Sequence, residues 1–370
     1  MKIERVVLYH LRMPLRAPFE TSFGRSETRD CVLIAIDSEG LVGYGECVAD
    51  AAPGYSPETV GTAWHVLRDF LVPSILGQEI EGPRAWPARV AAVRGHPMAK
   101  AGVELALWDL QGKREGRSLR ELLGGTRARV EVGVSVGIQP SPEALVDTVA
   151  GYLSQGYGRI KIKIKPGRDV AETQAVRRAF PSIRLQVDAN SAYTLENARA
   201  LLPLDDLDLL LIEQPLADDD LWDHHRLQAQ LRTALCLDES IHTQRHTRQA
   251  LEMGACRIIN IKPGRMGGLA EAIAIHDLCY AQGVPVWCGG MLETGVGRAA
   301  NLALASLPGF TLPGDISASD RYYAQDITVE RFVLETASTI AVPRGPGLGV
   351  TIDEAALARF TQAKLVLPMN

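Results

Sequence analysis

Apolar and polar positions first alternate along the chain and then change to a helical rhythm. Within the first 50 residues, three stretches are typical of half-buried strands, namely IERVVLYHL, DCVLIAID and GLVGYGECV. Ser38-Glu39-Gly40 predicts a hairpin turn between the second and third stretches. Helical patterns follow at 56–77, 98–112 and 118–123, the first opened by Ser56 with Pro57 just inside. Strands followed by helices predict an α+β unit.

From about Arg127 the pattern becomes a regular alternation of strand and helix. Eight apolar segments are separated by helix-patterned ones: VEVGVSVGI, RIKIKIK, IRLQVDAN, LDLLLIEQP, ALCLDES, CRIINIKPG, VPVWCGG and FTLPGD. Such alternation predicts a parallel sheet, and eight repeats favour closure into a (β/α) barrel of the α/β class. An open doubly wound sheet lacks its signal, because no GxGxxG or P-loop follows any of these strands.

Composition narrows the class of protein. The chain has 370 residues, which favours two domains, and a formal net charge of -5 without a basic stripe. Nucleic acid and anionic membranes are therefore not expected partners. The six cysteines are scattered without a CxxC pair, as expected for reduced thiols, and the N-terminus lacks an apolar signal segment. We expect a cytoplasmic protein.

Strong charges recur with the period of one strand-helix unit. Lys163, Asp188, Glu213, Asp238 and Lys262 are separated by 25, 25, 25 and 24 residues, each at or near the end of its strand. In a barrel, the carboxyl ends of the strands meet at one mouth, which carries the active site. The five charges are therefore expected to converge there.

The segment RIKIKIKPG alternates three isoleucines with Lys161, Lys163 and Lys165. The lysines face one side of a strand, which is either the solvent side of an amphipathic edge strand or the inside of the barrel. The recurrence of charges at the later strand ends favours the barrel interior for the first two. Lys165 is expected beyond the strand end, in solvent.

Three acids from successive strands predict a metal site. Asp188, Glu213 and Asp238 cannot all remain ionised in a partly desolvated mouth without a cation, and oxygen ligands without histidine or thiolate favour Mg²⁺, with Mn²⁺ as a substitute. The simpler alternative is that each acid only pairs with a neighbouring lysine. Lys163 and Lys262 would then flank the metal, with like charge from the cation, Lys161 and Arg265 lowering their pKa. This arrangement predicts removal of a proton α to a carboxylate.

The motifs resemble those of the enolase superfamily, in its muconate lactonizing enzyme subgroup. Enzymes of that superfamily are known to use Lys or His bases together with Mg²⁺ on carboxylate substrates. The resemblance covers nearly the whole chain: Lys161-Ile162-Lys163 matches the KxK motif on strand 2, Asp188, Glu213 and Asp238 match the metal ligands, and Lys262 matches the lysine on strand 6. Mandelate racemase-like members would instead carry a histidine on strand 7, where this sequence has Trp287-Cys288-Gly289-Gly290.

Within that subgroup the chain is similar to the o-succinylbenzoate synthase and N-succinylamino acid (N-acylamino acid) racemase family. The strings LQVDANSAYTL, INIKPGRMGG, PVWCGGMLETGVGRAAN and LPGDISASDRYY carry this resemblance, and Arg265 fits the branch in which both activities occur. Dipeptide epimerases, the nearest alternative, carry a DxD motif at the eighth strand, where this chain has Asp315-Ile316-Ser317. Other cycloisomerases of the subgroup and a non-catalytic metal-binding barrel are further alternatives.

The resemblance also implies a division into domains and a set of substrate contacts. Residues 1–126, completed by about 324–370, would form an α+β capping domain over a (β/α)7β-type TIM-like barrel of residues 127–323. The family positions that would contact the substrate are Phe19, Tyr55, Ser135, Asn190, Gly290, Met291 and Leu292. The implied partner is a small-molecule carboxylate, and a homo-oligomer is expected.

Two reactions are implied in one site. The first is dehydration of 2-succinyl-6-hydroxy-2,4-cyclohexadiene-1-carboxylate to o-succinylbenzoate in menaquinone synthesis. The second is racemisation of N-succinyl or N-acyl amino acids. Both substrates have a carboxylate for the metal and an acidic α proton, and the sequence does not rank them.

Overall fold

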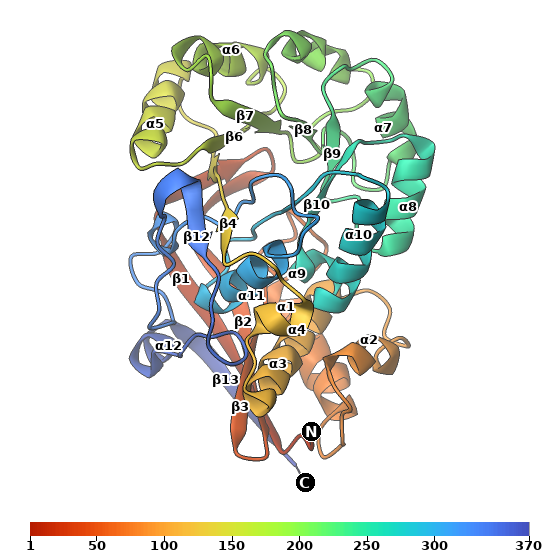
Figure 1. Cartoon of the computed structure of the whole chain (residues 1–370), viewed down its shortest axis with the longest axis vertical. Coiled ribbons are helices and arrows are strands. Elements are labelled where there is room, and N and C mark those ends of the chain that lie inside the picture. Colours follow the sequence, from red (N-terminus) through yellow and green to blue (C-terminus); the bar gives the residue numbers. More distant parts are fainter. Residues whose placement is uncertain (370) are drawn as a thin grey trace.

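An antiparallel four-stranded sheet, in the order β13-β1-β2-β3, forms the base of the molecule (Figure 1). The computed structural model describes residues 1–369. The strands of this sheet are β1 (Arg5–Thr21), β2 (Gly24–Ser38), β3 (Leu41–Cys47) and β13 (Thr361–Pro368). Glu39 and Gly40 have positive φ between β2 and β3, which confirms the predicted hairpin turn. Because β13 pairs with β1, the two ends of the chain lie in one sheet.

Helices cover one face of this sheet. They are α1 (Val60–Val66), continued by a π-helical turn (Leu67–Leu71) and a 3₁₀ turn (Val72–Ser74), then α2 (Trp86–Arg89), α3 (Pro97–Glu115) and α4 (Leu119–Leu123). The predicted start of the first helix at Ser56 is wrong. The hydroxyl of Ser56 accepts a hydrogen bond from the N–H of Glu58, and the helix begins at Val60 with Thr59 as its N-cap in a capping box.

A parallel seven-stranded sheet, in the order β11-β10-β9-β8-β7-β6-β5, forms the second part of the molecule. Its strands are β5 (Val134–Val136), β6 (Arg159–Lys163), β7 (Arg184–Asp188), β8 (Ile212–Glu213), β9 (Leu235–Leu237), β10 (Ile258–Ile261) and β11 (Val286–Cys288). The eighth predicted strand is not a regular strand. Its residues Phe310 and Gly314 form single parallel bridges to Val286 and Val132, so the segment links the last strand to the start of the first and closes the barrel.

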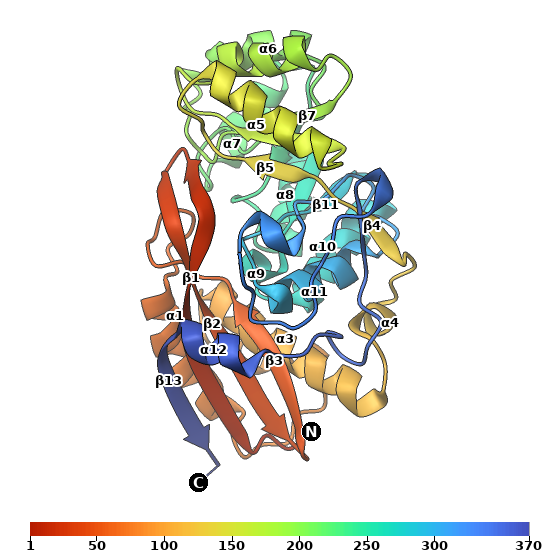
Figure 2. The ribbon, with the colours of Figure 1, turned by 90° about the vertical axis from the view of Figure 1, so that its left-hand side faces the viewer.

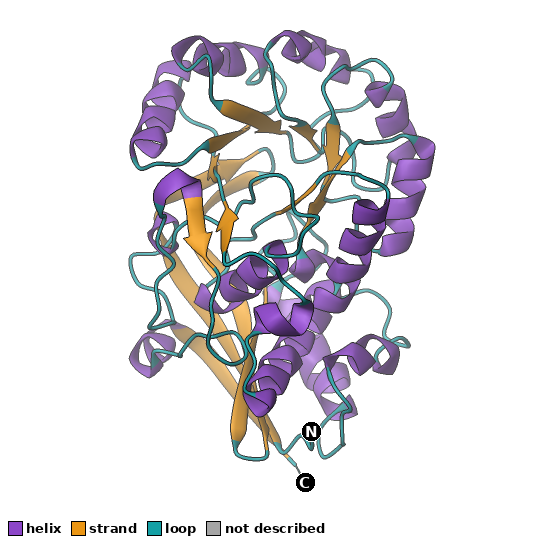
Figure 3. Cartoon of the chain, viewed as in Figure 1, coloured by secondary structure: helices purple, strands orange, loops and turns teal. Residues whose placement is uncertain are grey.

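The strands alternate with an outer ring of helices (Figure 3). The ring consists of α5 (Pro142–Ser154), α6 (Val170–Ala179), a 3₁₀ segment (Ala198–Asp206), α7 (Leu221–Gln228), α8 (Gln244–Met253), the short α9 (Pro263–Met266), α10 (Leu269–Ala281) and α11 (Gly295–Ala305). A proline, Pro203, lies inside the 3₁₀ segment, where an α-helix would lose a hydrogen bond. A short ribbon of β4 (Arg129–Glu131) and β12 (Thr339–Ala341) and the helix α12 (Glu354–Phe360) complete the chain. This is the predicted TIM-like barrel with an α+β cap.

The hairpin of β1 and β2 reaches from the cap to the barrel (Figure 2). At its tip the carbonyl of Glu20 accepts a hydrogen bond of 2.9 Å from the N–H of Ile138, and the hydroxyl of Ser22 donates one of 3.1 Å to the carbonyl of Asn190. The hairpin therefore lies over the carboxyl ends of β5 and β7. Across residues 1–369, no helix has the length and apolar character that crossing a membrane requires.

Candidate active site

Five charged residues stand at the carboxyl ends of successive barrel strands. Lys163, Asp188 and Glu213 are the last residues of β6, β7 and β8, while Asp238 and Lys262 directly follow β9 and β10. The parallel register pairs Lys163 with Asp188, and Asp188 with Glu213, so neighbouring side chains emerge at the same height. The spacing in the sequence therefore corresponds to one ring of charges around the barrel mouth.

Lys161 lies inside the barrel, below Lys163 on the same strand. Its side chain is 3% exposed, and β6 is flanked by β5 and β7, so the alternating lysines do not mark an edge strand. The ammonium is 2.8 Å from Glu213 Oε2, 3.0 Å from Asp188 Oδ2 and 2.6 Å from Asp315 Oδ2. Lys161 thus joins acids of three strand ends into one buried network.

Lys163 is held from two sides. Its Nζ donates hydrogen bonds of 2.6 Å to Asp188 Oδ2 and 2.7 Å to Asn190 Oδ1. Asn190 has a left-handed backbone, with φ 43°, and its amide nitrogen donates to Glu239 Oε1 at 2.9 Å. The turn after β7 therefore places the Asn190 amide between Lys163 and Glu239, and it bonds to both.

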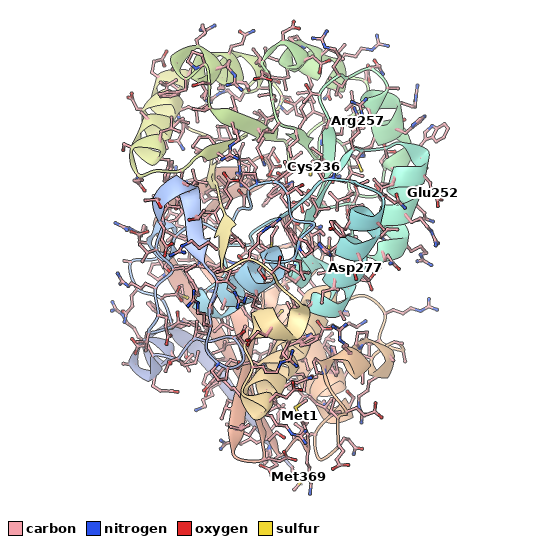
Figure 4. The ribbon with its side chains drawn as sticks, viewed as in Figure 1. Met1, Cys236, Glu252, Arg257, Asp277 and Met369 are labelled. Carbon is pink, nitrogen blue, oxygen red and sulfur yellow. The ribbon has the colours of Figure 1, made fainter. Side chains whose placement is uncertain are left out.

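Lys262 is held by an acid of the barrel and a phenol of the cap. Its Nζ donates to Asp238 Oδ2 at 2.6 Å and to the Tyr55 hydroxyl at 3.1 Å. Arg265 contacts the same partners: its guanidinium pairs with Asp238 and donates to the Tyr55 hydroxyl at 3.2 Å. The predicted influence of Arg265 on Lys262 would therefore pass through these shared groups. Asp238 lies two residues beyond Cys236, which Figure 4 labels on β9.

The protein's own charges favour protonated lysine at this site. Burial acts to lower the pKa of Lys262, but Tyr55 and the carboxylates of Glu213, Glu239 and Asp188 together raise it. The pKa of Lys161 is likewise raised, because Asp315, Glu213 and Asp188 outweigh the effect of burial. The like charge that was predicted to lower the pKa of Lys262 is thus outweighed by these groups.

The acids are also crowded. Burial and, next, the charge of Asp188 raise the pKa of Glu213. Burial and the same neighbour raise the pKa of Glu239 to about 7, and Glu239 Oε2 is buried without a hydrogen-bond partner. A divalent cation would relieve this accumulation of carboxylates.

Asp188, Glu213 and Asp238 are the side chains that could hold such a cation. All three are buried, at 1%, 0% and 0% exposure, and supply only hard oxygen donors, which fits Mg²⁺. Within residues 1–369, no three His, Cys, Asp or Glu side chains already stand in a metal-binding arrangement. The acids instead contact ammonium groups, so a cation would have to displace Lys161, Lys163 and Lys262 from these oxygens.

One cavity between cap and barrel brings most of the predicted residues together. It is lined by both Lys163 and Lys262, and by Phe19, Tyr55, Asn190, Gly290, Met291 and Leu292. Ser135 is not among its lining residues. Ser135 pairs in register with Lys161, lower in the barrel, and its hydroxyl is buried without a partner. Lys165 lies at the rim, partly exposed, 3.4 Å from Glu20.

Sequence reasoning missed several residues that hold this site. Asp315 pairs with Lys161 and also with Arg159, at 2.6 Å, and the amide of Asn260 donates to Glu213 Oε1 at 2.7 Å. Asp315 could have been found, because it ends the eighth segment, and the other acids also stand at or near the ends of theirs. Asn260 gave no signal, since its position inside β10 is set by the barrel and not by a local motif.

Family models match two parts of the chain. Residues 3–124 match the N-terminal domain of mandelate racemase and muconate lactonizing enzyme, and residues 144–356 match the enolase C-terminal domain-like family. The two matches correspond to the cap and to most of the barrel.

Individual proteins are similar over the whole chain. An o-succinylbenzoate synthase of Geobacillus kaustophilus is 52% identical, covering 99% of this chain and 98% of that protein. An N-succinylamino acid racemase of an Amycolatopsis species is 50% identical, covering 99% of each. A crystal structure of an enolase superfamily member from Listeria innocua has a TM-score of 0.96 at 42% identity, over 100% of both chains.

Proposed function

The chain belongs to the o-succinylbenzoate synthase and N-succinylamino acid racemase family of the enolase superfamily, and we propose from this premise that it removes the proton α to a substrate carboxylate. One observation supports this most directly: Lys163 and Lys262 line the same cavity from strands that are separated by three others in the sheet. Each is hydrogen-bonded to a different acid of one cluster. Two bases that approach one carbon from different sides suit proton removal and return.

Asp188, Glu213 and Asp238 would hold a divalent cation, Mg²⁺ in the first place and Mn²⁺ as a substitute. When bound, the cation supplies positive charge that stabilises the charge developing on the substrate carboxylate. Lys161 stays with Asp315 below the site and adds fixed positive charge close to Lys163. Arg265 tunes Lys262 through Asp238 and Tyr55.

In the synthase reaction, Lys163 removes the α proton from the cyclohexadiene carboxylate. The hydroxyl group then departs, and protonated Lys163 returns the proton to it, so that water and an aromatic ring result. Lys262 contributes positive charge on the opposite side. One base is sufficient for this reaction, which we place in menaquinone synthesis.

In the racemase reaction, both lysines must exchange protons with the substrate. Lys163 removes the α proton of one enantiomer, and Lys262 delivers a proton to the opposite face, with the roles reversed for the other enantiomer. Asn190 and Tyr55 orient the two ammonium groups by the hydrogen bonds described above. Phe19, Gly290, Met291 and Leu292 form the wall around the acyl group, and Ser135 lies below them.

A dipeptide epimerase is the alternative that the site disfavours. Such an enzyme needs acids free to hold a substrate ammonium group, whereas Asp315 is 7% exposed and paired with both Lys161 and Arg159. Ser317 stands where the second acid of the DxD motif would be. A free cationic amine would therefore find no available partner at this strand end.

The test is a direct assay of purified protein with Mg²⁺. We expect turnover of both the cyclohexadiene carboxylate and N-succinyl amino acids, and the ratio of kcat/KM values ranks the two reactions. Turnover of an Ala-Glu dipeptide in preference to both would contradict the proposal, and so would the absence of turnover with every one of these carboxylates.

A further inference from the structure

Two buried glutamates of the cap bond to the first turns of two barrel helices. Glu46, at the end of β3, accepts hydrogen bonds from the N–H of Thr294 at 3.1 Å, the Thr294 hydroxyl at 2.6 Å and the N–H of Gly297 at 2.9 Å. Thr294 is the N-cap of α11. Glu104, in the middle of α3, accepts from the N–H groups of Leu269 and Ala270, the first residues of α10.

These contacts compensate the burial of the two acids. Glu46 and Glu104 are 4% and 0% exposed, and removing a carboxyl group from water costs free energy unless its oxygens are bonded. Helix N-termini offer unpaired N–H groups and a positive dipole end, which are suitable partners. Both oxygens of each glutamate accept hydrogen bonds from these groups of the barrel.

The approach of the two acids requires glycine on the barrel side. A Cβ on Gly268, the N-cap of α10, would overlap the carboxyl group of Glu104. A Cβ on Gly297 would lie 2.9 Å from Glu46 Oε2 and 2.8 Å from Cγ of Glu293. At each helix start, a glycine therefore leaves room for the carboxyl group of the glutamate that bonds there.

Each bonded helix directly follows a loop of the candidate site. Residues 289–294 connect β11 to α11 and contain Gly290, Met291 and Leu292, which line the cavity. Residues 262–268 connect β10 to α10 through the short helix α9 and contain Lys262 and Arg265. In Figure 2, β3 and α3 lie beneath α9 and α11. The hydrogen bonds of Glu46 and Glu104 run from the cap to the helix starts that follow these two loops.

We infer that Glu46 and Glu104 are positioning residues through which the cap fixes two loops of the active site. Glu46 fixes the loop 289–294 and so the wall around the acyl group, and Glu104 fixes the loop 262–268 and so the place of Lys262. The consequences for kinetics rest on the proposed function, whereas the consequences for loop order do not.

The test compares Glu46→Gln and Glu104→Gln with a matched control, Asp109→Asn. Asp109 is also buried and lies on α3, but its carboxylate bonds to Tyr44, Lys113 and Leu348, all outside the barrel. In each glutamine variant an amide nitrogen would replace a carboxylate oxygen and face an N–H group. The comparison is made at about pH 8.5, above the raised pKa of Glu46, about 7, and of Glu104, about 8. Hydrogen exchange of the ligand-free full chain, followed in peptides covering 289–300 and 262–272, reports loop order without any substrate.

We expect Glu46→Gln to speed exchange in 289–300 by about five- to tenfold, the size of a lost helix cap, with 262–272 unchanged. Glu104→Gln should speed exchange in 262–272 and leave 289–300 unchanged. Asp109→Asn should affect neither loop selectively. Kinetically, Glu46→Gln should raise KM and alter the ranking of acyl groups, whereas Glu104→Gln should lower kcat for every substrate with the ranking kept.

Gly297→Ala is a second test of the role of Glu46, because it keeps Glu46 but displaces its carboxyl group. It should reproduce the selective exchange in 289–300. The inference is overturned if both loops exchange as in the wild type, or as in Asp109→Asn, in all three variants. If the loops respond as expected but the wild type turns over neither substrate, the proposed function fails and the positioning role stands.

Discussion

Lys161 and Lys163 on β6 and Lys165, two residues beyond its end, reach three environments. Lys161 is enclosed by Glu213, Asp188 and Asp315, Lys163 stands at the cavity beside Asp188, and Lys165 lies near the surface. Depth along the barrel axis therefore assigns each lysine its chemistry. Lys163 lines the cavity and can therefore contact a ligand. A cation bound to Asp188 would separate this carboxylate from the Lys163 ammonium group.

At the residue scale, the three acids at the strand ends can be tested by removing their charge. Asp188→Asn, Glu213→Gln and Asp238→Asn should each abolish turnover, because charge developing on the substrate loses stabilisation of several kcal/mol, and most of the fold should survive. Activity assays with far-UV circular dichroism check both points. The metal assignment is wrong if protein stripped with EDTA turns over at the normal rate, and full activity with zinc alone would contradict the oxygen-ligand set.

Phe19 tests the wall of the cavity. Its ring meets Tyr322 edge-on at a centroid distance of 6.0 Å and carries no atom that could bind a metal ion. Phe19→Ala should raise KM and change the ranking of acyl groups, with metal affinity unchanged. Steady-state kinetics on a series of N-acyl amino acids, together with a metal titration, measure this. Unchanged kinetics on every substrate would assign Phe19 to packing alone.

At this scale the sequence predicts more than a list of charged residues. The 25-residue period placed Lys163, Asp188 and Glu213 at one height, because each strand-helix unit of a barrel repeats the same path. Asn260 and Arg159 were not predicted, since their contacts depend on which side chains meet inside the closed barrel. No local motif encodes such a meeting.

At the element scale, the contact of β3 with α3 depends on glycine. A Cβ on Gly45 would clash with the carbonyl of Gly102 and lie 2.6 Å from the N–H of Ala106. Gly45→Ala should therefore lower the free energy of unfolding by about 3 kcal/mol, as overpacking does. Urea unfolding measures this.

A matched glycine offers the control for that substitution. Gly151 lies in α5, and a Cβ there would meet nothing within 4 Å. Gly151→Ala should leave stability unchanged or raise it slightly, since alanine favours helices. Equal effects of the two substitutions would contradict the close contact between β3 and α3.

The elements that sequence patterns misplaced have physical reasons. Ser56 and Pro57 have the composition of a helix start, but the chain at this point lines the cavity and turns only at Thr59. The eighth apolar segment contains Pro313, which has no N–H to donate to a ladder, so only single bridges, one of them at Gly314, close the barrel. Tertiary position decided the first case and a local residue the second.

At the scale of the whole molecule, the junction of cap and barrel should respond to pH. Burial raises the pKa of Glu104 from 4.5 to about 8, against the opposing effects of the N–H groups of Ala270 and Leu269, the Trp108 side chain and Arg84. Between these two values the unfolded chain loses a proton that the folded chain retains. The contribution of Glu104 to stability is thus complete below pH 4.5 and is lost as pH rises through about 8.

We expect this loss to amount to a few kcal/mol in the wild type and to be absent in Glu104→Gln. Urea unfolding at about pH 5 and about pH 8.5 gives the change in free energy for each protein, and the difference between the two changes isolates this residue. Identical pH dependence in both proteins would show that Glu104 keeps its ordinary pKa in the folded chain.

The most direct test of the whole account follows the α proton in deuterated water with Lys262→Arg. Arginine keeps the positive charge but is no usable base. With Lys163 as the remaining base, the variant should exchange the α proton of one enantiomer of an N-succinyl amino acid without inverting it, retain some dehydration and lose racemisation. Lys163→Ala should lose both reactions. Exchange with inversion in Lys262→Arg, or full synthase activity in Lys163→Ala, would contradict the assignment of two bases.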